Sequence, residues 1–218
     1  MNKHVLSSIL AIFGLLSISV AAFAADPAPP EVFQGHDPYS SLTIGYQDLE
    51  SLLQTVVLDT GPSSREMGKP TNTSTGTRMK VKVNRATMNE GNRFYFEIFG
   101  NNEENQQIIR NIRNRLESLP AVTPLEQYSR KEQLAYWINL YNITVIDEIV
   151  KVYPKRDLKG LLLGRNSILS MKTLEVAGVP LSLNDIQFSI LKNNYDNNPL
   201  IIYGLYQGII GGPNIRKS

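Results

Sequence analysis

Two stretches in the first half of the chain carry apolar residues at helical spacing. Between Tyr46 and Leu58 they recur every three or four positions, which predicts an amphipathic helix stopped by Gly61-Pro62. The same spacing predicts a second helix over residues 103–119, ending before Pro120. Three charged residues of that run are expected away from its apolar side: Arg110, Arg113 and Glu117.

A third helical run is apolar on nearly every side. It begins with a capping box formed by Ser129 and Glu132, and it continues to Tyr153, where Pro154 ends it. Because apolar residues surround most of its circumference, this run predicts a central, buried helix.

Alternation of apolar and polar residues predicts two hairpins. Residues 78–83 and 93–99 are typical of antiparallel strands joined by a long connection. Residues 171–176 and 179–181 predict shorter strands that turn at Ala177-Gly178.

The last part of the chain predicts one more helix and one more strand. Ser182 with Asp185 caps a helix through Leu191, which the polar turn 193–198 closes. Residues 200–206 are apolar at both odd and even positions, so both faces of a strand would be apolar, which predicts a buried strand.

These elements predict one α+β domain over residues 41–218. It has a central buried helix, amphipathic helices and short antiparallel hairpins, and no internal repeat or domain boundary interrupts it.

The first residues are typical of an export signal. A cationic start at Lys3 and an apolar core are followed by Ala22-Phe23-Ala24, which predicts cleavage after Ala24. A retained membrane anchor is the alternative, but the apolar core of about 16 residues is shorter than the roughly 20 that a bilayer needs. We therefore expect a signal peptide at 1–24, a flexible leader at 25–40, no transmembrane segment after cleavage, and a periplasmic or secreted protein.

Composition argues against several partners and chemistries. The chain has 22 basic and 20 acidic residues, so its net charge of +2 gives no reason to expect nucleic acid as a partner. Arg78, Lys80 and Lys82 form one basic stripe. Because they alternate with apolar residues, we interpret the stripe as the solvent-exposed face of a strand. The chain contains no cysteine, so a lipoprotein anchor and structural disulfides are excluded.

Residues that could act as nucleophiles or metal ligands are few. After signal removal His36 is the single histidine, which excludes Cys-His catalysis and disfavours zinc. Ser189 and Lys192 match a Ser-x-x-Lys pattern but lack its partner motifs, and the 193–198 run lacks the spacing of a calcium loop. The sequence predicts no catalytic residue, metal ligand or cofactor.

Acidic and amide residues on the central helix were the remaining candidates. Asp147 and Glu148 are adjacent, so they are expected to point in different directions and not to form a shared pair. Asn139 and Asn142 share one face. They can serve as structural hydrogen-bonding groups that tie loops to the core, or they can face a substrate.

Four ordered motifs resemble the domain-of-unknown-function 547 (DUF547) family. The match is strongest over 129–216 and loose over 46–128, and it rests on Gln133–Asn142 (QLAYWINLYN), Val152-Tyr153-Pro154, 176–178 with 181–186, and 199–216. Members of this family mostly lack an assigned activity, so the resemblance implies no particular reaction.

Several departures from the family pattern bear on function. Gln187-Phe188 stands where the resemblance implies Glu-His, and Lys192 where it implies Arg. Pro199-Leu200 and Ile202-Tyr203 replace its Pro-Arg and His-Phe steps, and Gln207 and Gly212 stand where it implies cysteines. The resemblance thus implies that reactive positions are lost while packing positions remain.

Two functions stay open on this basis. The first is a non-catalytic module for an unknown small-molecule or protein ligand, with Asn139, Asn142, Gln187 and Gln207 as candidate binding residues. The alternative is an envelope-directed hydrolase or transferase that uses Asp, Glu or Ser. A pocket lined by the four amides without a perturbed carboxylate favours binding, and a buried carboxylate with a shifted pKa favours catalysis.

The apolar run 200–210 is also a candidate interaction surface. The resemblance implies further elements that would cover this run, whose apolar residues are Leu200, Ile201, Ile202, Leu205, Ile209 and Ile210. An uncovered apolar patch predicts self-association or a partner through residues 200–210.

Overall fold

The structure is a computed structural model that describes residues 27–60, 91–155, 157–209 and 212–217. The predicted signal peptide at 1–24, the predicted strand 78–83 with its basic stripe, and Ile210 lie outside the described residues. The described part is a mostly helical α+β fold, the class that the sequence predicted. It contains two short antiparallel sheets of two strands each.

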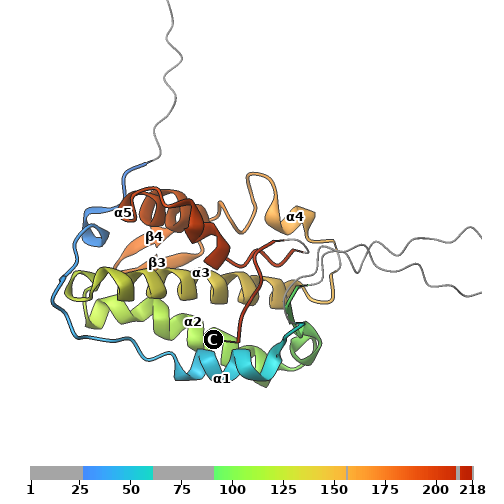
Figure 1. Ribbon diagram of the computed structural model, residues 1–218. Coiled ribbons are helices and arrows are strands. Elements are labelled where there is room, and N and C mark those ends of the chain that lie inside the picture. The colour runs from blue at the N-terminus through green and yellow to red at the C-terminus, as the bar shows by residue number, and fades with distance from the viewer. Residues whose placement is uncertain (1–26, 61–90, 156, 210–211, 218) are drawn as a thin grey trace, which may run out of the picture.

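Helix α3 (Arg130–Val152) forms the centre of the fold, as Figure 1 shows. Trp137, Leu140 and Ile143 are fully buried, which confirms the predicted central helix. The Ser129 hydroxyl accepts a hydrogen bond from the Glu132 N–H at 3.3 Å and so caps the helix. The Glu132 carboxylate accepts from the Ile44 N–H at 2.8 Å, so it ties the preceding chain to the helix start.

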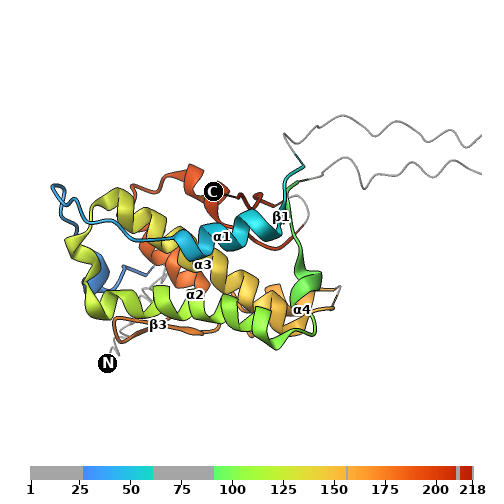
Figure 2. The same ribbon diagram turned by 90° about the horizontal axis from the view of Figure 1, so that it is seen from below.

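Helices α1 (Gln47–Val56) and α2 (Glu103–Val122) lie on one side of α3 (Figures 1 and 2). The predicted end of the second helix before Pro120 is wrong, because Pro120 is buried inside the last turn. Proline cannot donate to the carbonyl oxygen of Leu116 four residues earlier. The Tyr136 hydroxyl donates to that oxygen at 3.0 Å, which compensates for the missing bond.

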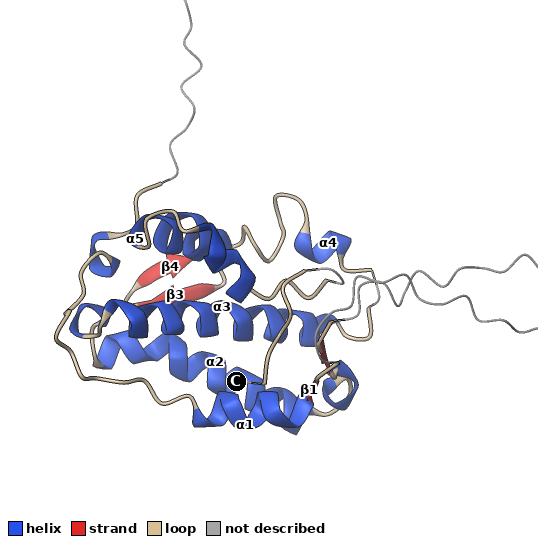
Figure 3. Cartoon of the chain, viewed as in Figure 1, coloured by secondary structure: helices blue, strands red, loops and turns tan. Residues whose placement is uncertain are grey.

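The hairpin of β3 (Leu174–Val176) and β4 (Val179–Leu181), drawn as red arrows in Figure 3, packs against α2 through β3. Leu174 pairs with Leu181 and Val176 with Val179, in antiparallel register. Ala177 and Gly178 have φ of 49° and 77°, the left-handed conformations that a two-residue hairpin turn requires. This confirms the predicted hairpin, with a first strand shorter than 171–176.

The other small sheet pairs β1 (Val57–Leu58) with β2 (Arg93–Phe94). The prediction of a strand over all of 93–99 is wrong, because Phe96–Phe99 forms a 3₁₀ helix. Phe94 and Phe99 stack with ring centroids 5.5 Å apart, whereas a strand would separate them by roughly 17 Å. Burial of both rings therefore bends the chain.

After β4 the chain forms a helix whose middle is π-helical (Asp185–Leu191) and whose last turn is α5 (Lys192–Asn194). The Ser182 hydroxyl accepts from the Asp185 N–H at 3.1 Å, and Asp185 accepts from the Ser182 N–H at 2.7 Å. This reciprocal cap confirms the predicted helix start. The polar run after it forms the predicted turn, with positive φ at Asp196 and Asn197.

The predicted buried strand over 200–206 is wrong. Pro199–Gly204 is a 3₁₀ helix, because the Asn198 side chain accepts from the Leu200 N–H and Pro199 occupies the first position. Leu200 and Tyr203 are 67% and 72% exposed, and only Leu205 and Tyr206 enter the core.

Residues 27–44 pack against α3. Phe33 is buried edge-on against Trp137, with ring centroids 5.0 Å apart. The Gln133 side-chain amide donates to the Gly35 carbonyl oxygen at 2.8 Å, and the Asn194 amide donates to that of Phe33 at 2.6 Å. The described part of the segment expected as a flexible leader is thus docked on the domain.

No helix in the described part of the chain has the length and apolar character to cross a membrane.

Candidate functional site

The structure distributes the four predicted binding residues between two cavities. Asn139 and Asn142 line a cavity of about 480 Å³ beside α1. Gln187 and Gln207 line another of about 590 Å³, near the loop that holds α4 (Lys159–Leu162). The sequence grouped the four residues together, but only the members of each pair share a cavity.

Asn142 acts as the structural hydrogen-bonding group that the sequence allowed. Its Nδ2 donates to the Gly204 carbonyl oxygen at 2.9 Å, and its Oδ1 accepts from the Tyr206 N–H at 2.7 Å. These bonds fasten the chain after the last 3₁₀ helix to α3. They also set the position of Gln207, the next residue.

Gly208 completes this attachment. Its φ is +67°, and a Cβ there would lie 2.3 Å from the Cδ1 of Ile149. The chain therefore approaches α3 more closely than another residue type would allow. Gln207, which lies between the bonded Tyr206 and Gly208, lines the cavity.

Gln187 comes from the π-helical segment Asp185–Leu191. Such segments are rare and are frequent at functional sites, since the wider turn changes the direction in which side chains point. Gln187 and Gln207 are both half-buried, and neither side-chain amide has a hydrogen bond with a residue that the structure describes. This contrasts with Asn142, whose amide is fully used.

The rest of the 590 Å³ cavity is mainly apolar. Tyr141 forms part of it, and burial raises the pKa of this hydroxyl to about 12, so it stays neutral. Two exposed residues of opposite charge, Asp157 and Lys159, stand at its rim. Its apolar wall consists of Val145, Leu158, Leu162, Leu163, Leu169 and Ile209.

This arrangement supplies hydrogen bonds and apolar contact, without a nucleophile and base in one place. Ser189 is buried and does not line the cavity. Within the described ranges, no group of three or more His, Cys, Asp or Glu residues could hold a metal ion. Two carboxyl groups, Asp48 and Asp185, have lowered pKa values, and neither lines this cavity.

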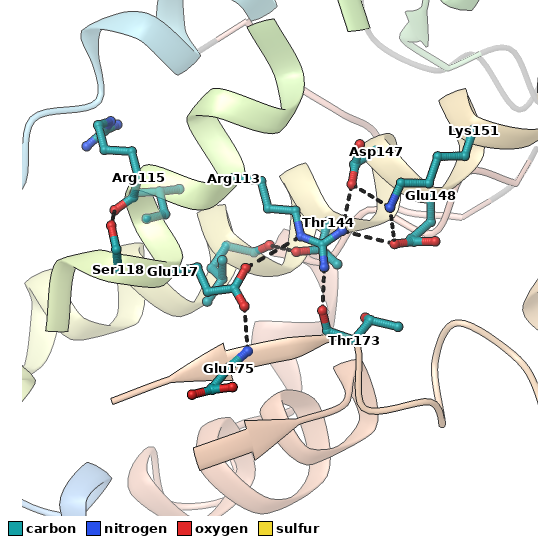
Figure 4. A network of polar contacts seen from close by, with 12 residues as sticks. Arg113, Arg115, Glu117, Ser118, Thr144, Asp147, Glu148, Lys151, Thr173 and Glu175 are labelled. Carbon is teal, nitrogen blue, oxygen red and sulfur yellow. Dashed lines mark hydrogen bonds and ion pairs between the residues drawn. The ribbon is translucent and has the colours of Figure 1, made fainter. Parts of the chain in front are cut away.

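Sequence reasoning missed a buried charge network centred on Arg113. This residue is only 7% exposed, which contradicts its predicted place away from the apolar side of α2. Figure 4 shows Asp147 and Glu148 converging on its guanidinium, at 2.6 and 2.9 Å from Nη1. The prediction that these carboxylates diverge is therefore wrong, because both of them reach the same guanidinium nitrogen of Arg113. Lys151 contacts both of them as well.

The network also holds the edge of the β3–β4 hairpin. Arg113 donates to the Thr173 carbonyl oxygen, and Glu117 accepts from the Glu175 N–H (Figure 4). The two α2 side chains thus satisfy backbone groups that a further strand would have satisfied. One signal could have suggested burial: Arg113 lies four residues after the buried Ile109.

Comparison with protein families confirms the predicted resemblance. Residues 125–217 match the model described as protein of unknown function, DUF547, which covers less than half of the 218 residues. The match includes α3, the β3–β4 hairpin and both Gln187 and Gln207. Searches of curated proteins and of solved structures gave no match to this chain.

Proposed function

We propose that this chain, which carries a DUF547 region at residues 125–217, is an exported, non-catalytic binding module. Its ligand is a small neutral molecule with an apolar body and an amide or carbonyl group, held in the cavity between Gln187 and Gln207. One observation carries the proposal: two half-buried amides without a described protein partner line one apolar cavity of about 590 Å³.

The size and lining of the cavity support a small molecule. Ligand pockets usually enclose about 300–1,000 Å³, are mainly apolar, and contain a few polar groups that set orientation. Gln187 and Gln207 are half-buried and their amides have no bond to a described residue, so both are open to hydrogen bonds from a ligand. Each amide offers both donors and an acceptor, which suits a primary or secondary amide on the ligand.

The charges favour a neutral ligand. Asp157 and Lys159 stand together at the rim and offset each other, and the remaining lining residues carry no charge. A charged head group inside would lose hydration without a counter-charge to replace it.

The family resemblance supports binding rather than catalysis. Gln187 and Gln207 occupy positions where the resemblance implies a glutamate and a cysteine. Amides at these places can hydrogen-bond a ligand but cannot act as base or nucleophile. The proposed export rests on the small residues at Ala22 and Ala24.

Calorimetric titration of the mature domain with octanamide tests the proposal. We expect saturable binding that Gln187→Leu and Gln207→Leu each weaken about tenfold, since each removes one proposed hydrogen bond to the ligand. Gln54→Leu is the matched control, because Gln54 is exposed on α1 and bonds only Glu50 nearby. Leu163→Trp, at an exposed lining position, should fill the cavity and block binding.

Two results would contradict this function. One is equal affinity in Gln54→Leu, Gln187→Leu and Gln207→Leu. The other is unchanged binding in Leu163→Trp, which would place octanamide elsewhere on the protein.

A further inference from the structure

A second cavity, of about 480 Å³, lies between α1, α3 and two C-terminal segments. Its lining is mainly apolar and includes several polar residues. From the helices come Leu49, Leu53, Ala135, Ile138, Asn139, Asn142, Ile143 and Ile146, and from the C-terminal segments Tyr203, Gly204, Asn214, Ile215 and Arg216. The last segment is anchored, since Ile215 is buried and its carbonyl oxygen accepts from the Asn92 side chain at 3.0 Å.

Charge distinguishes this cavity from the first one. Arg216 is its sole charged lining residue, and no acidic residue lines it. Arg216 is exposed and forms no ion pair with any residue that the structure describes. A guanidinium without a carboxylate beside it, at the mouth of an apolar space, suits an anionic head group.

Neutral hydrogen-bonding groups line the same cavity or lie beside a lining residue. Asn142 is fully bonded to the chain, but Asn139 is available to the cavity and lies beside the Tyr46 hydroxyl. That hydroxyl is buried without a formed hydrogen bond. Burial, with a contribution from the Glu132 charge, raises the Tyr46 pKa, so the hydroxyl stays protonated and neutral. Tyr46 therefore supplies no negative charge that would compete with an anionic ligand for Arg216.

We infer that this cavity is a second binding site, for a small amphipathic carboxylate. The carboxylate pairs with Arg216, and the alkyl or aryl body lies against Leu53 and Ile138. The first site takes a neutral molecule and this one an anion, because the rim charges cancel in one and not in the other. The second site does not depend on the function proposed for the first.

Calorimetric titration with octanoate, below its micellar range, tests the inference, with octanol as the uncharged analogue. We expect octanoate to bind more tightly than octanol, and salt to reduce that preference. Arg216→Gln should weaken octanoate binding about threefold or more and abolish the preference, since the pair is partly exposed. Lys217→Gln is the matched control, because it removes the same charge one residue away and does not line the cavity.

Two filling variants locate the ligand. Leu53→Trp and Ala135→Leu both reduce the space beside α1 and α3, and each should block octanoate binding. Circular dichroism establishes that each variant is folded, and Gln207→Leu should leave octanoate binding unchanged. The inference is overturned if Arg216→Gln and Lys217→Gln have equal effects, if octanol binds as tightly as octanoate, or if both folded filling variants bind normally.

Discussion

Replacing Arg113 by methionine tests whether the buried network holds the fold together. Methionine keeps most of the side-chain length but removes the cation between Asp147 and Glu148. It also removes the donor to the Thr173 carbonyl oxygen. Two carboxylates would then stay in the interior with Lys151 as their remaining described cation.

The expected cost follows from burial. The Arg113 and Asp147 side chains are 9% and 3% exposed, and removal of one partner from such a pair costs about 3–5 kcal/mol. For a domain of this size, each kcal/mol lowers the melting temperature by roughly 2–4 °C. We therefore expect Arg113→Met to lower it by about 6–20 °C.

Arg115→Met is a matched control on the same helix. Arg115 makes two hydrogen bonds to Asp48, at 2.7 and 2.8 Å, but the two side chains are 38% and 42% exposed. A solvent-exposed pair of this kind contributes about 0–1 kcal/mol. The two arginines have similar distances to their carboxylate partners, and burial separates them.

Urea unfolding followed by fluorescence provides the measurement. Trp137 is the single tryptophan and is fully buried, so its emission reports the core directly. Combining Arg113→Met with Asp147→Leu should recover part of the lost stability, since the double variant no longer buries that unpaired carboxylate. A loss below about 1 kcal/mol, or one equal to that of Arg115→Met, would refute the reasoning.

Four further predictions follow from other parts of the structure. Asn142→Ala should cost about 1–3 kcal/mol because it leaves the Tyr206 N–H without its partner, and Asn139→Ala should cost less; unchanged melting temperatures would show these amides to be dispensable. Desolvation alone would raise the pKa of Asp185, but hydrogen bonds from Ser182 and the charge of Lys172 lower it below 3.8. The stability from Asp185 should therefore be present above that value and be lost as pH falls through the lowered pKa, and an acid titration should show a shallower loss for Asp185→Asn. Exported protein should begin at Ala25, and an intact mass that retains residues 1–24 would contradict cleavage there. A second copy should dock on the exposed patch of Leu200, Ile202 and Tyr203, so light scattering should detect oligomers that Ile202→Lys removes; monomers at all concentrations would contradict this.

The sequence determined the elements whose signals are local. The Ser129 and Ser182 caps, the periodicity of α3 and the Ala177-Gly178 turn each depend on residues within a few positions of one another. Local geometry alone can satisfy such signals, so they survive into the tertiary structure. The ordered motifs of 129–216 likewise predicted the family region, which the match over 125–217 confirms.

Tertiary structure decided the conformation of each element that depends on a distant partner. Pro120 remains helical because Tyr136, from another helix, donates to the carbonyl oxygen that proline leaves unbonded. The run after Pro199 turns instead of extending, since its local cap forms and no strand lies beside it in the described sheets. A run that is apolar at both odd and even positions fits a buried strand or a short helix, so periodicity could not distinguish them.

The same division applies to the candidate site. Residue types alone indicated that Asn139, Asn142, Gln187 and Gln207 were the amides to consider. Their assignment to two cavities depends on how the chain after Pro199 returns across α3, which Asn142 and Gly208 control. The charge network likewise joins Arg113 to Asp147 across 34 residues of sequence. Sequence spacing carries no information about such a contact, because only the packing of α2 on α3 brings the two side chains together.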